Sequence, residues 1–192
     1  MFQGGFKKSL ITFLIFIIGV FLIYFIVSQF FEKISSEEVT FETEKEEMTK
    51  DQKIDYSAPV FELSNIEGEK VKLSDYIDKM IVLTFWTTWN SAAQDQLVIL
   101  ESYYQEIKDS EDVVLITINN QEDKNVVSNF IRRGEYILPV LLDEDGAVGE
   151  LYGIGVLPAT YFINQERKVK EVYIGILNKE EIRDKVGRLY LQ

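Results

Sequence analysis

The stretch FWTTWNSAAQDQ, Phe85 to Gln96, decides how the chain folds around it. Its first two residues end the apolar run MIVLTFW, residues 80–86. An almost uninterrupted apolar run of this length predicts a strand that is buried on both faces. The apolar residues that follow recur at helical spacing: Leu97, Leu100, Tyr104 and Ile107. The stretch therefore turns sharply from a buried strand into a helix, which we expect from Ser91 to Lys108.

The rest of the chain after residue 57 alternates in the same way between strand-like and helix-like patterns. Further strands are predicted at residues 58–65, 70–75, 112–119, 136–143, 157–164 and 168–176. Further helices are predicted at 75–79, 125–133, 146–153 and 178–192, the last capped by Asn178. Buried strands that alternate with helices, followed by an antiparallel pair, predict a mixed sheet covered on both faces. The fold class is therefore an α/β three-layer sandwich of the thioredoxin type.

Composition excludes several kinds of chemistry. The 192 residues contain neither Cys nor His. The chain therefore has no thiol nucleophile, no disulfide, no thiolate or His-ligated metal site, and no imidazole that could act as a base near neutral pH. We expect no cofactor and no metal site.

The charge is strongly negative, with a formal net charge of −12. Nucleic acid is an improbable ligand for such a chain, because phosphates need a basic surface. The distribution is uneven: residues 1–31 carry only Lys7 and Lys8, whereas residues 32–53 carry eight acids against four bases.

An apolar segment follows the two lysines. The run from Leu10 to Val27 holds 15 Leu, Ile, Phe or Val residues in 18 positions. As a helix it would be about 27 Å long, close to the ~30 Å hydrocarbon core of a membrane. We predict that it spans the membrane, with the basic N-terminus in the cytoplasm and the acidic remainder outside. A cleaved signal peptide and a buried core helix are the alternatives; the first lacks a small-x-small cleavage site, and without Cys there is no lipidation site.

These patterns divide the chain into four parts. Residues 1–9 form a short cytoplasmic N-terminus, 10–31 a transmembrane anchor that contacts lipid, 32–56 an acidic tether, and 57–192 the thioredoxin-like domain.

Three stretches in this order carry a family resemblance: APVFEL with KVKLSDY at the entry, VLTFWTTWNSAAQDQ at the loop, and GVLPATYFIN near the end. With them, residues 57–191 resemble the membrane-anchored TlpA/ResA-like thiol-disulfide oxidoreductases and, more loosely, the wider redoxin group. The resemblance implies a thioredoxin fold, an extracytoplasmic domain and the transfer of disulfides in cytochrome maturation, sporulation or oxidative folding.

The chain departs from that family where the chemistry would occur. In the comparison, Asn90 and Ala93 stand at the two cysteine positions. Gln96 stands where some anchored members keep an acid that helps to transfer protons, and Thr84 where thioredoxins bury one. Disulfide exchange needs an attacking thiolate and a resolving thiol. The resemblance therefore does not carry the activity over to this chain.

The replaced residues fit a structural role. Asn and Ser are preferred helix caps, and Ser91 with Gln94 matches the S-x-x-Q capping box. We interpret Asn90 and Ser91 as a repair of the helix N-terminus. A nucleophilic Ser91 is the weaker alternative, because no His or nearby Lys could act as its base.

Two other motifs are interpreted as turns. The sequence DEDG, Asp143 to Gly146, lacks the third ligand position and the distal Glu of a calcium loop, and predicts a strand-to-helix turn. Residues 153–155, GIG, precede a strand rather than a helix and do not continue as a dinucleotide fingerprint.

Three residues are candidates for binding a partner. Trp86 lies on a buried strand and is expected in the core, whereas Trp89 lies at the tip of the loop and could contact another protein. Pro158 stands where the resembling family keeps a cis proline, which there exposes the preceding backbone, here Leu157, to an extended substrate chain. The alternative is that Pro158 only shapes its loop.

Two functional classes stay open. In the first, the domain is a non-catalytic binding, scaffold or chaperone-like module for an extracytoplasmic protein or peptide. In the second, it belongs to the oxidoreductases, either because its cysteines were removed by engineering or because a partner supplies the thiols. Engineering commonly replaces Cys by Ser or Ala, and Asn90 is neither, so the sequence favours the first class.

Overall fold

A computed structural model describes residues 25, 27 and 55–191. The chain divides into two units, Met1–Lys50 and Asp51–Gln192, and the fold below is that of the second. Apart from Phe25 and Val27, the predicted membrane span lies outside the described residues, as does most of the tether. Within the part that the structure does describe, no helix has both the length and the apolar character needed to cross a membrane.

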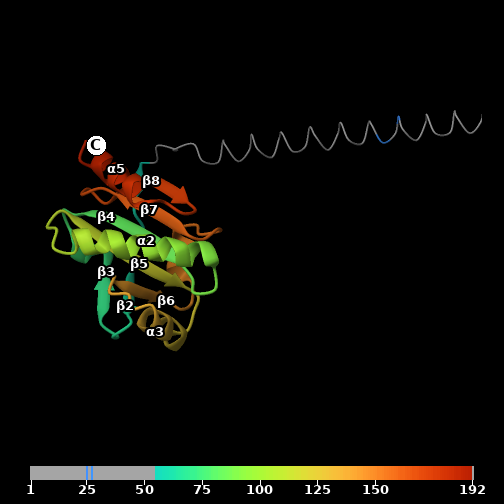
Figure 1. Ribbon diagram of the computed structural model, residues 1–192. Helices are drawn as coiled ribbons and strands as arrows, with labels where there is room; N and C mark the ends of the chain where they lie inside the picture. Colours follow the sequence, from blue (N-terminus) through green and yellow to red (C-terminus); the bar gives the residue numbers. More distant parts are fainter. Residues whose placement is uncertain (1–24, 26, 28–54, 192) are drawn as a thin grey trace, which may run out of the picture. The chain divides into compact units, whose positions relative to one another are not determined.

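The domain is built on one mixed sheet of eight strands (Figure 1). In spatial order these are β1 (Tyr56–Ser57), β8 (Lys168–Ile174), β7 (Ala159–Ile163), β4 (Met80–Trp86), β5 (Val113–Asn120), β6 (Val140–Asp143), β2 (Glu62–Asn65) and β3 (Lys70–Lys72). The central strands β4, β5 and β6 run parallel, and the remaining neighbours pair antiparallel. The predicted mixed sheet and the predicted β7–β8 hairpin are both confirmed.

Helices cover both faces of this sheet. One core contains side chains of α2 (Ser91–Ile107), α3 (Lys124–Arg133) and α5 (Lys179–Leu189); the other contains side chains of η1 (Leu73–Tyr76) and α4 (Ala147–Leu151). Strand β4 separates the two cores, because its alternate side chains point to opposite faces. Met80, Val82 and Trp86 belong to the first core, and Ile81, Leu83 and Phe85 to the second. Figure 1 shows α2 running across the sheet over β4 and β5.

Two local features differ from the sequence expectation. The short helix after β3 is a 3-10 turn over Leu73–Tyr76, earlier than the predicted 75–79, because the buried Leu73 begins it. Tyr56 and Ser57 form an extra edge strand that pairs with Lys168 and Val169 of β8. No pattern predicts this pairing, since two polar, exposed residues carry no periodicity.

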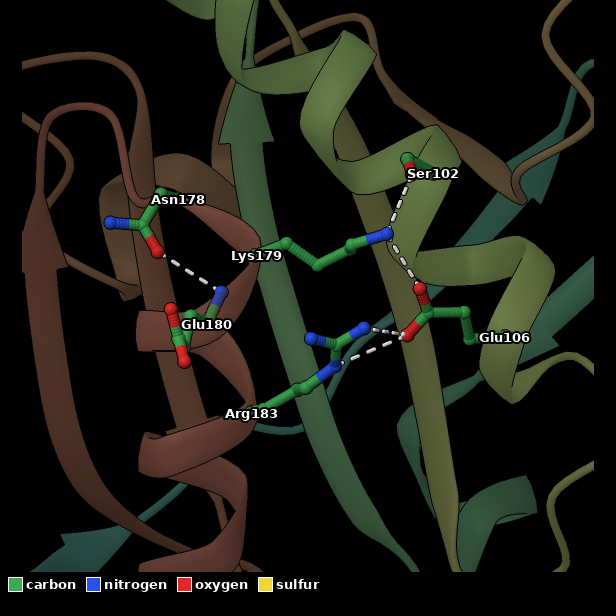
Figure 2. Close-up of polar contacts among 6 residues, drawn as sticks. All are labelled: Ser102, Glu106, Asn178, Lys179, Glu180 and Arg183. Atoms are coloured by element: carbon green, nitrogen blue, oxygen red, sulfur yellow. Dashed lines mark hydrogen bonds and ion pairs between the residues drawn. The ribbon is translucent and has the colours of Figure 1, made fainter.

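Helix α5 begins as predicted at the cap Asn178, whose side chain accepts hydrogen bonds from the backbone N–H groups of Glu180 and Glu181. Its first turns lie beside the C-terminal half of α2. Figure 2 shows Lys179 and Arg183 of α5 both pointing at Glu106 of α2, in contact with its two carboxylate oxygens.

Candidate functional site

Within the stretch Phe85 to Gln96, residues 87–90 form a four-residue turn between β4 and α2. Trp86 ends the strand and is fully buried in the core, as predicted. Trp89 lies at the tip of the turn and is 72% exposed. An indole on the surface at the entrance to a helix is free to contact another molecule, whereas Trp86 is not.

Asn90 connects two segments that lie far apart in the sequence. Its Oδ1 accepts a hydrogen bond of 3.1 Å from the backbone N–H of Ala93, which caps α2. Its Nδ2 donates a hydrogen bond of 3.1 Å to the carbonyl oxygen of Leu157. Both groups of one amide are therefore used, one on the helix N-terminus and one on the loop that carries Pro158.

The capping box expected from Ser91 and Gln94 is not formed. Asn90, not Ser91, is the cap, because its extended backbone (φ −90°, ψ 115°) places the side chain over the first turn. Ser91 is the first helical residue, as predicted. The Gln94 side chain instead donates to the carbonyl oxygen of Thr88 at 2.6 Å, which fixes the turn from the other side.

The Leu157–Pro158 segment and the end of β8 lie together. The Leu157–Pro158 peptide bond is cis. The backbone N–H of Gly175 donates to the carbonyl oxygen of Pro158 at 2.8 Å, with Gly175 at φ 116°, a conformation that favours glycine. Pro158 is itself buried, whereas Leu157 is half-buried and reaches the surface.

Gln96 connects α2 to the loop that follows β8. It is fully buried, and its Oε1 accepts a hydrogen bond of 2.6 Å from the backbone N–H of Leu177. Its Nε2 has no hydrogen-bond partner among the described residues. Thr84 is also fully buried, and its hydroxyl shares a hydrogen bond of 3.0 Å with that of Thr160 on the neighbouring strand β7. Both positions thus hold neutral groups that bind other protein groups.

Glu122, a carboxylate that no sequence motif indicated, also holds the turn between β4 and α2. Glu122 accepts hydrogen bonds from the backbone N–H of Thr88 (2.6 Å), the hydroxyl of Thr88 (2.5 Å) and the side-chain amide of Asn119 (2.7 Å). Glu122 belongs to no motif. Only an indirect signal could have indicated that Glu122 lies at the turn. Because β4 and β5 are adjacent parallel strands, the polar residues that follow each strand meet at the same edge of the sheet.

Glu122 and Tyr161 are titratable groups near the turn. Tyr161, behind the turn against Phe85, has its pKa raised to about 12 by burial, and its hydroxyl donates to the carbonyl oxygen of Tyr152. The described residues contain no group of three or more acidic side chains placed to hold a metal ion. Asp143 accepts hydrogen bonds from the backbone N–H groups of Val148 and Gly149, so DEDG is the strand-to-helix turn that was predicted.

Comparison with known proteins decides the family. Residues 54–172 match the AhpC/TSA family. This chain belongs to that family. Among its relatives, the thiol-disulfide oxidoreductase ResA of Bacillus subtilis is 34% identical over 127 residues, 66% of this chain and 70% of that protein. ResA of Geobacillus thermodenitrificans is 33% identical over 127 residues, 66% of this chain and 72% of the relative.

Solved structures show the same fold. StoA of Bacillus subtilis is 26% identical, with a TM-score of 0.60 over 67% of this chain and 96% of StoA. The exposed lipoprotein thioredoxin Etrx1 of Streptococcus pneumoniae is 28% identical, with a TM-score of 0.62 over 68% of this chain and 99% of Etrx1. The thioredoxin-like fold and the resemblance to ResA are therefore confirmed, in a family member that has no cysteine.

Proposed function

We propose that this protein is a membrane-anchored, extracytoplasmic member of the family that binds a protein or peptide partner without thiol chemistry, as a scaffold or chaperone-like module. One observation carries the proposal. Asn90 stands where the resemblance to the TlpA/ResA-like proteins implies the attacking cysteine, and both ends of its amide are already hydrogen-bonded within the domain.

The chemistry of disulfide exchange supports a function without thiols. Disulfide exchange passes through a mixed disulfide, which forms only when a thiolate attacks a sulfur. The sequence contains no cysteine, an amide is no substitute, and Gln96 is a neutral group where the resemblance implies that some members keep an acid. The chain alone therefore has no group that could begin or resolve the exchange.

The surface around Asn90 supports a binding role. Trp89 is exposed beside it, and three further exposed apolar residues flank the two loops held by Asn90 and Gly175: Val156, Ile174 and Ile176. Exposed apolar side chains on a fixed backbone are typical of an interaction surface. Because the carbonyl oxygen of Leu157 already accepts a hydrogen bond from Asn90, we propose that a partner is held mainly by apolar side chains against Trp89 and Leu157, rather than by backbone pairing alone.

The location is part of the proposal. Lys7 and Lys8 precede the apolar segment and acids dominate after it, which favours an extracytoplasmic domain. A relative with the same fold is named an exposed lipoprotein. A protease added to spheroplasts should digest the domain and leave residues 1–9 protected; protection of the whole domain would contradict this topology.

The function is tested by separating binding from redox activity. A photo-crosslinking amino acid at position 89, introduced into the full-length protein in its own membranes, should join a partner that the same group at the exposed Val60 does not join. The unmodified full-length protein, given dithiothreitol and a protein disulfide, should reduce it no faster than dithiothreitol alone. Turnover above that background would contradict the proposal and favour the oxidoreductase alternative.

A further inference from the structure

A groove of about 660 Å³ lies between α2 and α3, on the side of the turn that carries Thr88. Its volume falls in the range of roughly 300–1,000 Å³ that is usual for binding sites. Residues of the turn and α2 line one wall, and residues of α3 and the segment after it line the other: Thr88, Gln94, Asp95 and Val98, then Val126, Asn129, Phe130, Arg133, Gly134 and Tyr136.

Aromatic rings fix the shape of the groove. The ring of Phe130 packs on the buried Trp86 with 5.6 Å between ring centroids, and stacks on Tyr136 at 6.0 Å with an interplanar angle of 11°. Gly134 makes this stack possible, because a Cβ at this position would come within 2.2 Å of the Tyr136 ring. The aromatic side of the groove is therefore shaped by packing within the domain.

Apolar side chains are exposed on both walls. Val98 on α2 is 58% exposed and Val126 on α3 is 48% exposed, and both line the groove. Together with Phe130 they form an apolar strip that an aliphatic side chain of a ligand could cover.

The two walls carry opposite polarity. On the α2 wall, Asp95 is a carboxylate, and Gln94 keeps its Oε1 as an acceptor because its Nε2 donates to Thr88. On the α3 wall, Arg133 is a guanidinium, and Asn129 keeps its Nδ2 as a donor because its Oδ1 accepts from Arg132. Within the described residues, neither Asp95 nor Arg133 has an ion pair or a hydrogen bond from its side chain.

We propose that this groove binds a peptide segment of a partner protein in which an apolar side chain lies between a basic side chain and a carboxylate. The basic group would pair with Asp95, the carboxylate with Arg133, and the apolar side chain would lie on Val98, Val126 and Phe130. Charge complementarity of this kind selects the ligand and its direction. Trp89 and Leu157 do not line the groove, so this is a second surface, independent of the function proposed above.

The test uses short fluorescent peptides and the full-length protein in detergent. The probes carry one Lys, one Leu and one Glu, separated by zero to three Ala residues in either order. Fluorescence anisotropy should detect binding of at least one spacing. With the best probe, Gln in place of its Lys, or Gln in place of its Glu, should each weaken binding roughly 3- to 10-fold, and Ser in place of its Leu should weaken it further.

Matched protein variants show whether the contacts are those proposed. Asp95→Asn should weaken binding of the parent probe but change little the binding of the probe that lacks Lys. Arg133→Gln should weaken binding of the parent probe but change little the binding of the probe that lacks Glu. Methyl NMR should show the largest shifts at Val98 and Val126. Trp89→Ala should bind the probe as the natural protein does, which keeps this test separate from that of the proposed function.

Three outcomes overturn the proposal: no spacing binds, all charge variants of the probe bind equally, or the methyl shifts occur at Ile174 and Ile176 instead. Thermal melts of Asp95→Asn and Arg133→Gln should match that of the natural protein, since both residues are exposed. When the melts match, a loss of binding reports on the groove rather than on unfolding of the domain.

Discussion

The two ends of helix α2 are held in different ways. At the N-terminal end, Asn90 and Gln96 use neutral amides to hold the backbone of Leu157 and Leu177, and Gln96 is fully buried. In the C-terminal half, Glu106 is at the surface and binds Lys179 and Arg183 of α5, each at 2.6 Å (Figure 2).

The difference has a physical consequence. Hydrogen bonds between neutral buried groups change little with pH or salt, and a buried N–H that loses its acceptor has a high cost. Ion pairs at the surface are screened and contribute little. The N-terminal end of α2 is therefore the end where substitutions should matter most, which is expected if the amides of Asn90 and Gln96 keep the loops that carry Leu157 and Leu177 in place.

The largest effect is expected from Gln96→Ala. Removing this side chain leaves a cavity and deprives the N–H of Leu177 of its acceptor, at a cost of about 2–3 kcal/mol in the free energy of unfolding. Gln105→Ala, at an exposed position of the same helix, is the control and should cost less than about 0.5 kcal/mol. Urea unfolding of the full-length protein measures the loss of stability of both variants. Equal losses would contradict the difference between the two ends of α2.

Asn90→Ala should have the next largest effect, about 1–2 kcal/mol, because it removes the cap of α2 and the bond to Leu157. Asn90→Asp separates the two contributions, since a carboxylate can cap the helix but cannot donate to a carbonyl oxygen. Its loss of stability should fall between zero and that of the Ala variant. If Asp is as stable as Asn, the bond between Asn90 and Leu157 contributes nothing.

Much of this fold was visible in the sequence, since β4 and α2 carry strong and different periods, and so do β5 and α5. Asn90 and Gln96 were also among the residues that the sequence singled out. Their partners were not, because Leu157, Leu177 and Glu122 contribute through distant backbone groups or from a loop without a motif. The capping box was predicted at Ser91, whereas Asn90 is the cap of α2. Both residue types cap helices well, and only the backbone angles decide between them.

Glu106→Gln should have a small effect that depends on pH and salt. Hydrogen bonds from Lys179, then from Arg183, lower the pKa of Glu106 below its ordinary value of about 4.5. Its stabilisation is therefore fully present at neutral pH and is lost as the pH falls through the lowered pKa of the folded state. Melting curves of the two proteins should differ slightly at pH 7 in low salt and coincide at pH 2 or in 1 M NaCl. A difference that persists in high salt would mean that the contact is not mainly electrostatic.

Trp89→Ala should leave stability unchanged within about 0.5 kcal/mol, because the side chain is exposed. Capture of the partner should nevertheless be lost, as judged by crosslinking from position 156 instead. Val60→Ala, at a residue that is 69% exposed elsewhere on the domain, is the control and should retain capture. A Trp89 variant that unfolds, or that still captures the partner, would show that this indole is not a contact.

The most direct test of the central claim, that the turn keeps the geometry of a redox loop with Asn90 and Ala93 at its thiol positions, is the double substitution Asn90→Cys, Ala93→Cys. The two positions are three residues apart across the first turn of α2, where Cα atoms can fall within the ~4.4–6.8 Å that a disulfide spans. Under mild oxidant, mass spectrometry of the full-length variant should show an intramolecular disulfide that dithiothreitol releases. The thiol at position 90 should also react faster than free cysteine near neutral pH, because the helix N-terminus stabilises its thiolate. Two cysteines that stay reduced in a folded protein would contradict the claim and limit the family relationship to the fold.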